Sequence, residues 1–277
     1  MKNVFTFLLL LFSLLCNGQS PKLFTTDKEL SSSLINQIYQ DRNGFIWIAT
    51  EDGLNRYDGA KFTIYKHEPN NEHSLAHNFV RTVFEDSKGH LLIGTYIGIQ
   101  MYDPATDNFT PLAKLEDTGE TLESNINSFI ERKNGEIWVS GNVLCKLDIK
   151  DHLLTVRKVD IAVTSPGSLF EDKKQNVWMA KGEEGVYQLT PDNQLTLHLS
   201  KDNGYVKSIC EDQRGNIYVG SIRKGLFIYD KERKTFVPID LKEKGELPVC
   251  FLYSGIPNEL YIGTDGKGVV IYNIRTH

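Results

Sequence analysis

The hydrophobic pattern of this chain consists of short apolar runs separated by polar turns, and the stretch Asp41–Asp58 shows it most clearly. Asp41 and Gly44 suit a tight turn, because Asp accepts hydrogen bonds from nearby backbone and Gly tolerates a positive φ. The run Phe45–Ile48 is typical of a strand buried on both faces. A second polar turn then leads into Leu54–Tyr57, so the stretch predicts a pair of antiparallel strands.

The same pattern recurs six times along the chain, at a spacing of roughly 40 to 46 residues that is typical of four-stranded propeller blades. The residues that close the first turn are Gly44, Gly89, Gly135, Gln175, Gly215 and Asn258. The residues three positions later are Trp47, Leu92, Trp138, Trp178, Tyr218 and Tyr261. Every copy except the third also has a Gly nine or ten residues after the turn. Six copies in register indicate a repeat architecture.

Each copy is preceded by another apolar run and most are followed by one, which gives four strands per unit. No helical periodicity follows residue 18. We therefore predict an all-β propeller of four-stranded blades with six recognisable repeats. The repeats lie at approximately 30–70, 75–115, 122–160, 165–200, 204–240 and 247–277.

The ends of the chain bear on how the ring closes. The sixth copy stops at His277, just after its third strand, whereas Phe24 precedes the first copy at the place of an outer-strand aromatic. We predict that a strand near Phe24 completes the sixth blade, because joining the termini removes exposed sheet edges. The alternative is that the chain is a fragment of a seven-bladed ring.

The first 18 residues predict a secretory signal peptide. Lys2 is followed by the apolar run Val4–Leu15, which is too short for a mature membrane span, and then by small and polar residues. Cleavage is expected near Gln19, so the propeller occupies residues 19–277 in the periplasm. Anchoring as a lipoprotein through Cys16 is disfavoured, since Leu15 stands where such a signal has a small residue.

Charge and cysteine content narrow the function. The chain has 31 Lys and Arg against 36 Asp and Glu, a formal net charge of −5, which argues against nucleic acid or an anionic membrane as partner. The cysteines beyond the signal peptide are Cys145, Cys210 and Cys250, an odd number in apolar runs, so no disulfide framework is expected. No second apolar stretch is long enough to cross a membrane.

The repeated residues themselves are expected to be structural. Each acidic turn offers one or two oxygen ligands, fewer than calcium needs, and the tryptophans lie in the middle of a buried strand. His67, His73 and His77 share one long polar loop that lacks the fixed geometry of a metal site. We predict no metal, no cofactor and no catalytic residue, although a nucleophile with partners distant in sequence stays open.

Candidate binding residues follow from topology. In a four-stranded blade, the turns between the second and third strands and the connections between blades emerge on one face, around the mouth of the central channel. Amide, carboxylate, guanidinium and phenol groups gathered there suit a hydroxyl-rich ligand. Residues predicted on this face are Asn36, Glu51, Asn55, Arg56, Arg81, Tyr96, Asn127, Asn142, Lys181, Arg223, Lys224, Asp265 and Lys267.

The pattern Gly-Phe-Ile-Trp-Ile-Ala-Thr-Glu-Asp-Gly-Leu-Asn-Arg-Tyr-Asp that starts at Gly44 resembles the two-component regulator propeller repeat, as does its counterpart from Gly89. Copies one, two and five match best. This repeat fills the periplasmic sensor region of hybrid two-component system proteins of Bacteroidetes. The resemblance implies a non-catalytic sensor of glycan-derived oligosaccharides, whose partner is the ligand or a neighbouring sensor domain.

The resemblance also implies parts that this sequence does not show: a second propeller, an immunoglobulin-like domain, a membrane helix, a histidine kinase and a response regulator. We therefore expect the chain to be the N-terminal part of such a sensor, with homodimers formed through the downstream domains. Two alternatives remain. A propeller lyase requires a His and a carboxylate or metal at the channel mouth, and a pure scaffold requires an exposed apolar patch on one rim.

Overall fold

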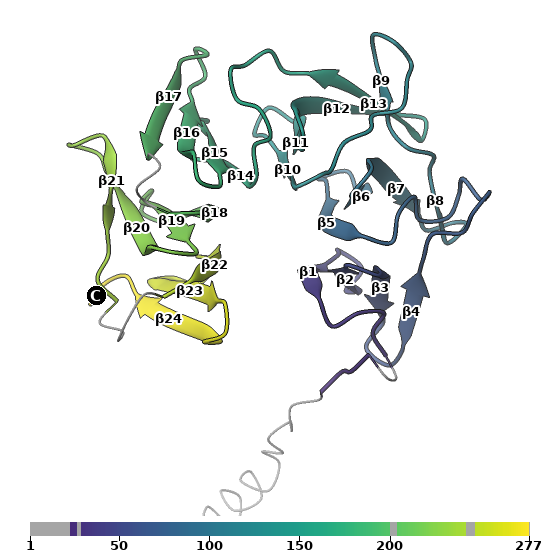
Figure 1. The fold of residues 1–277 in the computed structure, drawn as a ribbon, viewed down its shortest axis with the longest axis horizontal. Coiled ribbons are helices and arrows are strands. Elements are labelled where there is room, and N and C mark those ends of the chain that lie inside the picture. The colour runs from purple at the N-terminus through teal and green to yellow at the C-terminus, as the bar shows by residue number, and fades with distance from the viewer. Residues whose placement is uncertain (1–22, 27–28, 200–203, 242–246, 277) are drawn as a thin grey trace, which may run out of the picture.

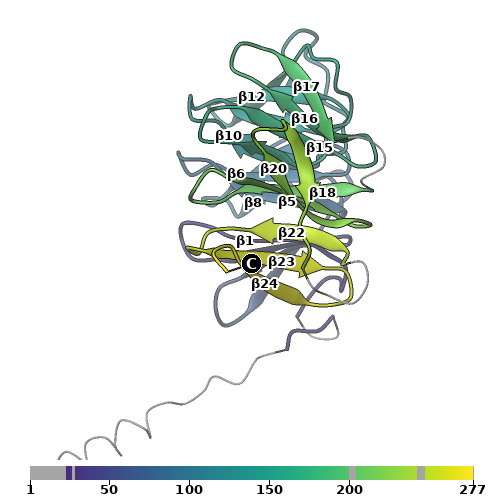
Figure 2. The same ribbon diagram turned by 90° about the vertical axis from the view of Figure 1, so that its left-hand side faces the viewer.

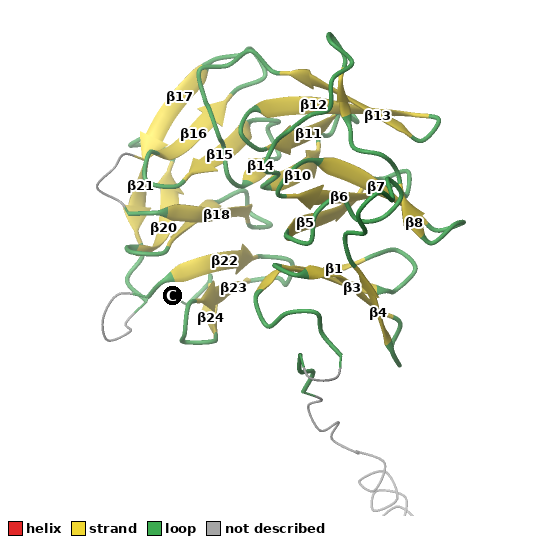
Figure 3. Cartoon of the chain, turned by 45° about the vertical axis from the view of Figure 1, so that its right-hand side comes forward, coloured by secondary structure: helices red, strands yellow, loops and turns green. Residues whose placement is uncertain are grey.

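The computed structural model describes residues 23–26, 29–199, 204–241 and 247–276, and every regular element within them is a strand (Figure 3). The first blade contains β1 (Ile35–Gln40), β2 (Ile46–Thr50), β3 (Gly53–Tyr57) and β4 (Phe62–Tyr65). The second contains β5 (Val80–Glu85), β6 (Leu91–Thr95), β7 (Ile99–Asp103) and β8 (Asn108–Phe109). The third contains β10 (Ser128–Glu131), β11 (Ile137–Ser140), β12 (Leu144–Lys150) and β13 (Leu153–Lys158), with β9 (Lys114–Leu115) added at its edge.

The second half of the chain repeats the design. The fourth blade contains β14 (Leu169–Glu171), β15 (Val177–Lys181), β16 (Gly185–Leu189) and β17 (Leu195–Leu199). The fifth contains β18 (Val206–Glu211), β19 (Ile217–Ser221), β20 (Gly225–Asp230) and β21 (Thr235–Pro238). The sixth contains β22 (Val249–Tyr253), β23 (Glu259–Thr264) and β24 (Val269–Asn273).

The sheets stand around a central axis as an arc, in chain order, with the first and sixth blades at its two ends (Figure 1). Figure 2 shows the sixth blade, β22 to β24, in the foreground at one end of this arc. The predicted fold class, an all-β propeller with six blades, is confirmed. Within the described residues, no helix is long and apolar enough to span a membrane.

One predicted detail at the blade edges was wrong. Described residues near Phe24 form no strand and are not part of the sixth sheet. The Phe24 ring instead packs on the first blade, with its centroid 5.1 Å from that of Tyr57 and 5.0 Å from that of Phe62. The segment Lys114–Leu115, at the approximate boundary of the second repeat, pairs in parallel with β13 of the third blade.

The core is divided into layers between consecutive blades. Trp47 and Leu54 of the first blade, for example, pack against Val83 and Ile93 of the second. Equivalent clusters join the second blade to the third, the third to the fourth, the fourth to the fifth and the fifth to the sixth. A central strand therefore buries both of its faces, which explains its continuous apolar sequence.

The first turn of each blade keeps one backbone conformation even where its sequence varies. Gly44 has a φ of 88°, and the residues that replace Gly in the fourth and sixth copies, Gln175 and Asn258, have φ values of 66° and 63°. The turn requires the left-handed region, which Gly enters without strain and Asn with little. The weaker copies of the repeat therefore form the same turn.

The signal peptide predicted at residues 1–18, including Cys16, lies outside the described residues.

Candidate functional site

The turns between the first two strands of the blades form one face of the arc, here called the turn face, and four of them begin with an Asp. In the fourth blade, Asp172 Oδ1 accepts the backbone N–H groups of Lys174 and Asn176 at 2.8 and 2.9 Å. Its Oδ2 accepts the Trp178 indole N–H at 2.8 Å. Asp41 bonds Trp47 in the same way at 2.7 Å. These carboxylates are buried and fully occupied, which supports a structural role.

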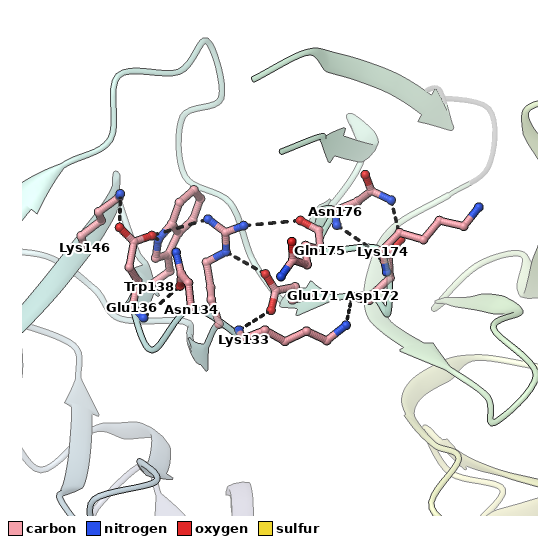
Figure 4. A network of polar contacts seen from close by, with 11 residues as sticks. Lys133, Asn134, Glu136, Trp138, Lys146, Glu171, Asp172, Lys174, Gln175 and Asn176 are labelled. Carbon is pink, nitrogen blue, oxygen red and sulfur yellow. Dashed lines mark hydrogen bonds and ion pairs between the residues drawn. The ribbon is translucent and has the colours of Figure 1, made fainter. Parts of the chain in front are cut away.

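The turn face also links neighbouring blades through glutamates. Glu171 of the fourth blade accepts the backbone N–H of Lys133 of the third at 2.7 Å and the Arg132 guanidinium at 2.9 Å (Figure 4). The other glutamates that end inner strands make equivalent contacts with the preceding blade: Glu85 with Arg42, Glu131 with Ser87 and Glu211 with Lys173. The polar groups of this face thus hold the ring together.

The opposite face, here called the connection face, carries the turns between second and third strands together with the connections between blades. Backbone hydrogen bonds fix this arrangement: Glu51 N–H donates to Leu34 C=O at 3.2 Å, and Tyr96 N–H donates to Phe79 C=O at 3.0 Å. The turn in the sixth blade is attached likewise, since Asp265 N–H donates to Pro248 C=O at 3.0 Å. The two sets of loops predicted to share a face do so.

Asn55 does not lie on the connection face, contrary to prediction. Its side chain is completely buried on the outer side of the first blade, where Oδ1 accepts the Ser31 backbone N–H at 2.9 Å. Its Nδ2 donates to Ser31 Oγ at 2.8 Å and to Ile48 C=O at 3.2 Å. An amide with all its bonds made inside the protein anchors the N-terminal segment and is not available to a ligand.

The predicted position of Arg56 was also wrong. Its side chain points between the first two blades and not onto the connection face. Its guanidinium pairs with Asp107 at 2.9 Å, bonds the Tyr102 hydroxyl and lies 5.7 Å from the Trp47 ring centroid. Burial and the hydrogen bond to Asp107 raise the pKa of Tyr65 far above its usual value. Burial acts to raise the pKa of Asp107 too, but hydrogen bonds from Tyr102 and Tyr65 and the charge of Arg56 outweigh it, and the net pKa is lowered.

Several predicted residues reach the connection face but are held by neighbours. Asn36 and Asn127 donate from their amides to the next blade, to Val80 C=O at 2.8 Å and to Pro166 C=O at 3.0 Å. Lys181 pairs with Glu184 at 2.8 Å, and Arg223 pairs with Glu183 at 2.9 Å. The side chains of the remaining polar set are exposed on this face: Glu51, Asn142, Lys224, Asp265 and Lys267.

Tyr96 is the centre of an aromatic group on the same face. Its ring is 54% exposed and lies 5.6 Å from that of His77 and 6.0 Å from that of Phe79. The Arg81 guanidinium lies 5.9 Å from the Phe79 ring centroid. Arg81 occupies a β-bulge on the innermost strand, since the pairing register of β5 shifts between Val80 and Thr82. Tyr96 and Arg81, both predicted on this face, each lie beside the Phe79 ring.

The contribution of His77 and Phe79 to this aromatic group was not predicted from the sequence. His77 was read as part of a mobile polar loop, but its Nδ1 accepts the Phe79 backbone N–H at 2.9 Å, and this bond positions the ring beside Tyr96. The available signal in the sequence was the spacing of two aromatic residues, His77 and Phe79, just before the inner strand β5.

A hollow of about 650 Å³ near Asn142, between Glu123 and Lys158, lies on the same face.

A second hollow of about 650 Å³ lies at the outer rim between the second and third blades. Its lining is mostly apolar and includes Ile97, Leu112 and Leu153, together with His67 and His152. This hollow could not be predicted from the sequence, because it depends on how the hairpin of β12 and β13 lies beside the loop that follows β4.

His90 and His198 bond separate partners in different parts of the molecule. His90 bonds Asp86 at 2.7 Å on the turn face, and His198 bonds Gln188 at 2.7 Å between the fourth and fifth blades. Burial lowers the pKa of His198. In the part of the chain that the structure describes, no three His, Cys, Asp or Glu side chains are grouped in a way that could hold a metal ion.

Comparison with known proteins agrees with this architecture. The family model of the two component regulator propeller matches residues 29–52, 74–96 and 200–223, which contain the first turn of copies one, two and five. The chain is 37% identical over 83 residues to Histidine kinase P4 of Formosa agariphila, a match that spans 27% of this chain and 6% of that protein. Three segments of the chain therefore match the two-component regulator propeller repeat.

Solved structures share the fold at low sequence identity. The extracellular domain of the putative hybrid two component system BT4673 from B. thetaiotaomicron superposes with a TM-score of 0.74 at 18% identity, covering 93% of this chain and 37% of that one. A catalytically inactive virginiamycin B lyase from Staphylococcus aureus gives a TM-score of 0.64 at 12% identity, covering 93% and 88%. The chain thus spans little more than a third of the BT4673 domain.

Proposed function

We propose that this chain is the ligand-sensing propeller of a two-component sensor, that it works in the periplasm, and that it binds oligosaccharides released from glycans without catalysing a reaction. The repeat class supports the sensor role, since it is the class found in two component regulators. The observation that carries the carbohydrate proposal is the exposed Tyr96 on the connection face, next to the Phe79 ring that Arg81 also approaches.

The chemistry of this group fits a sugar. An aromatic ring with one exposed face packs against the C–H face of a pyranose, while its hydroxyl stays in water. Arg81 supplies several N–H donors in a fixed plane for sugar hydroxyls. His77 and Phe79 support the Tyr96 ring on its other sides, so the ring is positioned before ligand arrives. The exposed Glu51 and Asn142 add acceptors elsewhere on the same face.

Signalling then follows from a difference in affinity between two arrangements of domains. A ligand on the connection face biases the position of whichever domain contacts that face, by no more than its differential binding free energy. Export is part of the proposal: N-terminal sequencing of protein from the periplasmic fraction is expected to begin near Gln19.

Calorimetric titration with pools of oligosaccharides tests the binding proposal. We expect heat of binding from at least one pool, and a loss of affinity of about tenfold or more in Tyr96→Ala and in Arg81→Ala, the scale of a lost stacking or charged contact. Tyr205→Ala is the matched control, because Tyr205 is also an exposed tyrosine but belongs to the fifth blade. Absence of heat with every pool, or equal losses in all three variants, would refute carbohydrate binding at Tyr96.

A further inference from the structure

The hollow at the outer rim between the second and third blades, here called the rim hollow, has the size and lining of a small-molecule site. Its volume of about 650 Å³ is within the range of about 300–1,000 Å³ that is typical of ligand pockets. Leu153, in its lining, is 69% exposed, and Ile97 and Leu112 are half-buried. An apolar side chain this exposed beside an apolar hollow gains free energy when a hydrophobic ligand covers it.

One wall of the rim hollow is held in place by Gln100, which is 1% exposed. Its Oε1 accepts the Ala76 backbone N–H at 2.6 Å. Its Nε2 donates to Ser74 C=O at 3.0 Å and to Thr110 C=O at 2.8 Å. Leu75 is completely buried between the first two blades. The loop that follows β4 and the connection that follows β8 are therefore tied to each other before any ligand binds.

The short strand β9 fixes the part of the connection that carries Lys114. Ala113 N–H donates to Ile99 C=O of the second blade at 2.9 Å, and Glu116 N–H donates to Val156 C=O of the third blade at 2.9 Å. Between these two bonds, β9 pairs in parallel with β13. The connection is thus bonded to both blades, so the rim hollow is preorganised, which lowers the entropic cost of binding.

The charged groups of the rim hollow favour an anionic ligand. The Lys114 ammonium group is exposed and has no ion pair or hydrogen bond with any residue that the structure describes. His67 and His152 also line the hollow, and the Nδ1 of His67 donates to a backbone carbonyl at 2.9 Å. Among the described lining residues, Glu72 is the single carboxylate, and its Oε1 lies 3.9 Å from His73 Nε2.

We propose that the rim hollow binds an amphipathic carboxylate, whose apolar body packs on Ile97, Leu112 and Leu153 and whose carboxylate pairs with the Lys114 ammonium. Burial of the apolar body supplies most of the affinity, and the charge-assisted contact orients the molecule. A sugar suits these walls poorly, because its hydroxyl groups would lose water without gaining partners. The rim hollow is therefore a second site, with a ligand of another class than that proposed for the connection face.

Calorimetric titration of the full chain with decanoate, below the concentration at which micelles form, tests this proposal. Decan-1-ol is the neutral probe of the same length. We expect decanoate to bind about tenfold or more tightly than decanol, and this difference to disappear in Lys114→Gln, because only the carboxylate uses the ammonium group. In Leu153→Ser, both probes are expected to lose affinity by about tenfold or more, since part of the apolar wall is removed.

Two matched controls lie outside the rim hollow. Lys150→Gln changes another exposed lysine of the same hairpin, and Leu197→Ser changes another exposed leucine, in the fourth blade. Both are expected to bind decanoate as the wild type does, and an unchanged Tm shows that each variant is folded. Absence of heat with decanoate, or equal affinity of the wild type for the two probes, overturns the proposal. Losses in the control variants as large as those in Lys114→Gln and Leu153→Ser overturn it as well.

Discussion

The Asp carboxylate that recurs on the turn face shows how many hydrogen bonds one residue of this repeat accepts. Asp172 is almost completely buried and accepts hydrogen bonds from two backbone N–H groups, the Asn176 amide and the Trp178 indole. It fixes the turn and the orientation of the central aromatic with the same two oxygens. A carboxylate with that occupancy recurs in copies one, two, four and five for structural reasons and leaves no ligand position free.

Replacing this carboxylate tests its structural role. Asp172→Ala removes the acceptor of all four bonds and leaves the Trp178 N–H unpaired in the core, so we expect the free energy of unfolding to fall by about 2–4 kcal/mol. Urea denaturation followed by tryptophan fluorescence measures the change. Asp117→Ala, at an exposed loop position, is the control and should alter stability by less than about 0.5 kcal/mol. Equal effects of the two substitutions would contradict the assignment.

Glu136 gives a prediction in pH. Burial acts to raise its pKa, but hydrogen bonds from Lys146, the Trp138 indole and Asn134 outweigh burial and lower the pKa from 4.5 to about 2 (Figure 4). A carboxyl with a depressed folded pKa adds stability above pH 4.5 and loses it as the pH falls toward 2. The stability difference between wild type and Glu136→Gln should therefore be largest at neutral pH and shrink across this window. Denaturation midpoints measured from pH 2 to 7 would show it, and a constant difference would disprove it.

At the scale of the strand and turn, the repeat is regular because all six blades require the same backbone conformation in their turns. The glycine that opens the third strand is the strictest case. Gly185 has a φ of 119°, and a Cβ placed on it would lie 1.4 Å from the Leu199 carbonyl oxygen. Gly135, in contrast, has a φ of 83° but no atom within 4 Å of such a Cβ.

These two glycines make a matched pair of substitutions. Gly185→Ala forces β16 away from β17 and is expected to cost more than about 3 kcal/mol, because backbone must move. Gly135→Ala meets only the strain of a left-handed Ala and is expected to cost about 1–2 kcal/mol. Thermal unfolding of both variants separates the steric effect from the conformational one. Similar losses of Tm in the two variants would show that the strands adjust freely.

The sequence pattern predicted strands, turns, blade number and the face on which the connections lie, because those depend on alternation and on turn residues. It could not place Asn55 or Arg56, which neighbour the second turn in sequence. Two residues into β3, side chains alternate between the two sides of the sheet, so Asn55 points outward to Ser31 and Arg56 points to the second blade. Tyr96 was placed correctly because it lies in the turn itself.

The N-terminal segment was misplaced for a related reason. An aromatic residue such as Phe24 is typical of an outer strand, but the residue type does not show which sheet the segment joins. The side chain finds Tyr57 and Phe62 on the blade nearest in sequence, and Ser31 is tied to Asn55 beside it. Local contacts close less chain than contacts between the two termini, and therefore cost less entropy.

The whole molecule is an arc of sheets in which each apolar layer joins one blade only to the next. Stability in such an array is close to a sum of the stabilities of single units and of the interfaces between neighbours. An inner blade is supported from both sides and an end blade from one. Heat should therefore unfold this arc from its ends, with β22–β24 detaching before the fifth blade and β1–β4 detaching before the second blade, which carries Tyr96.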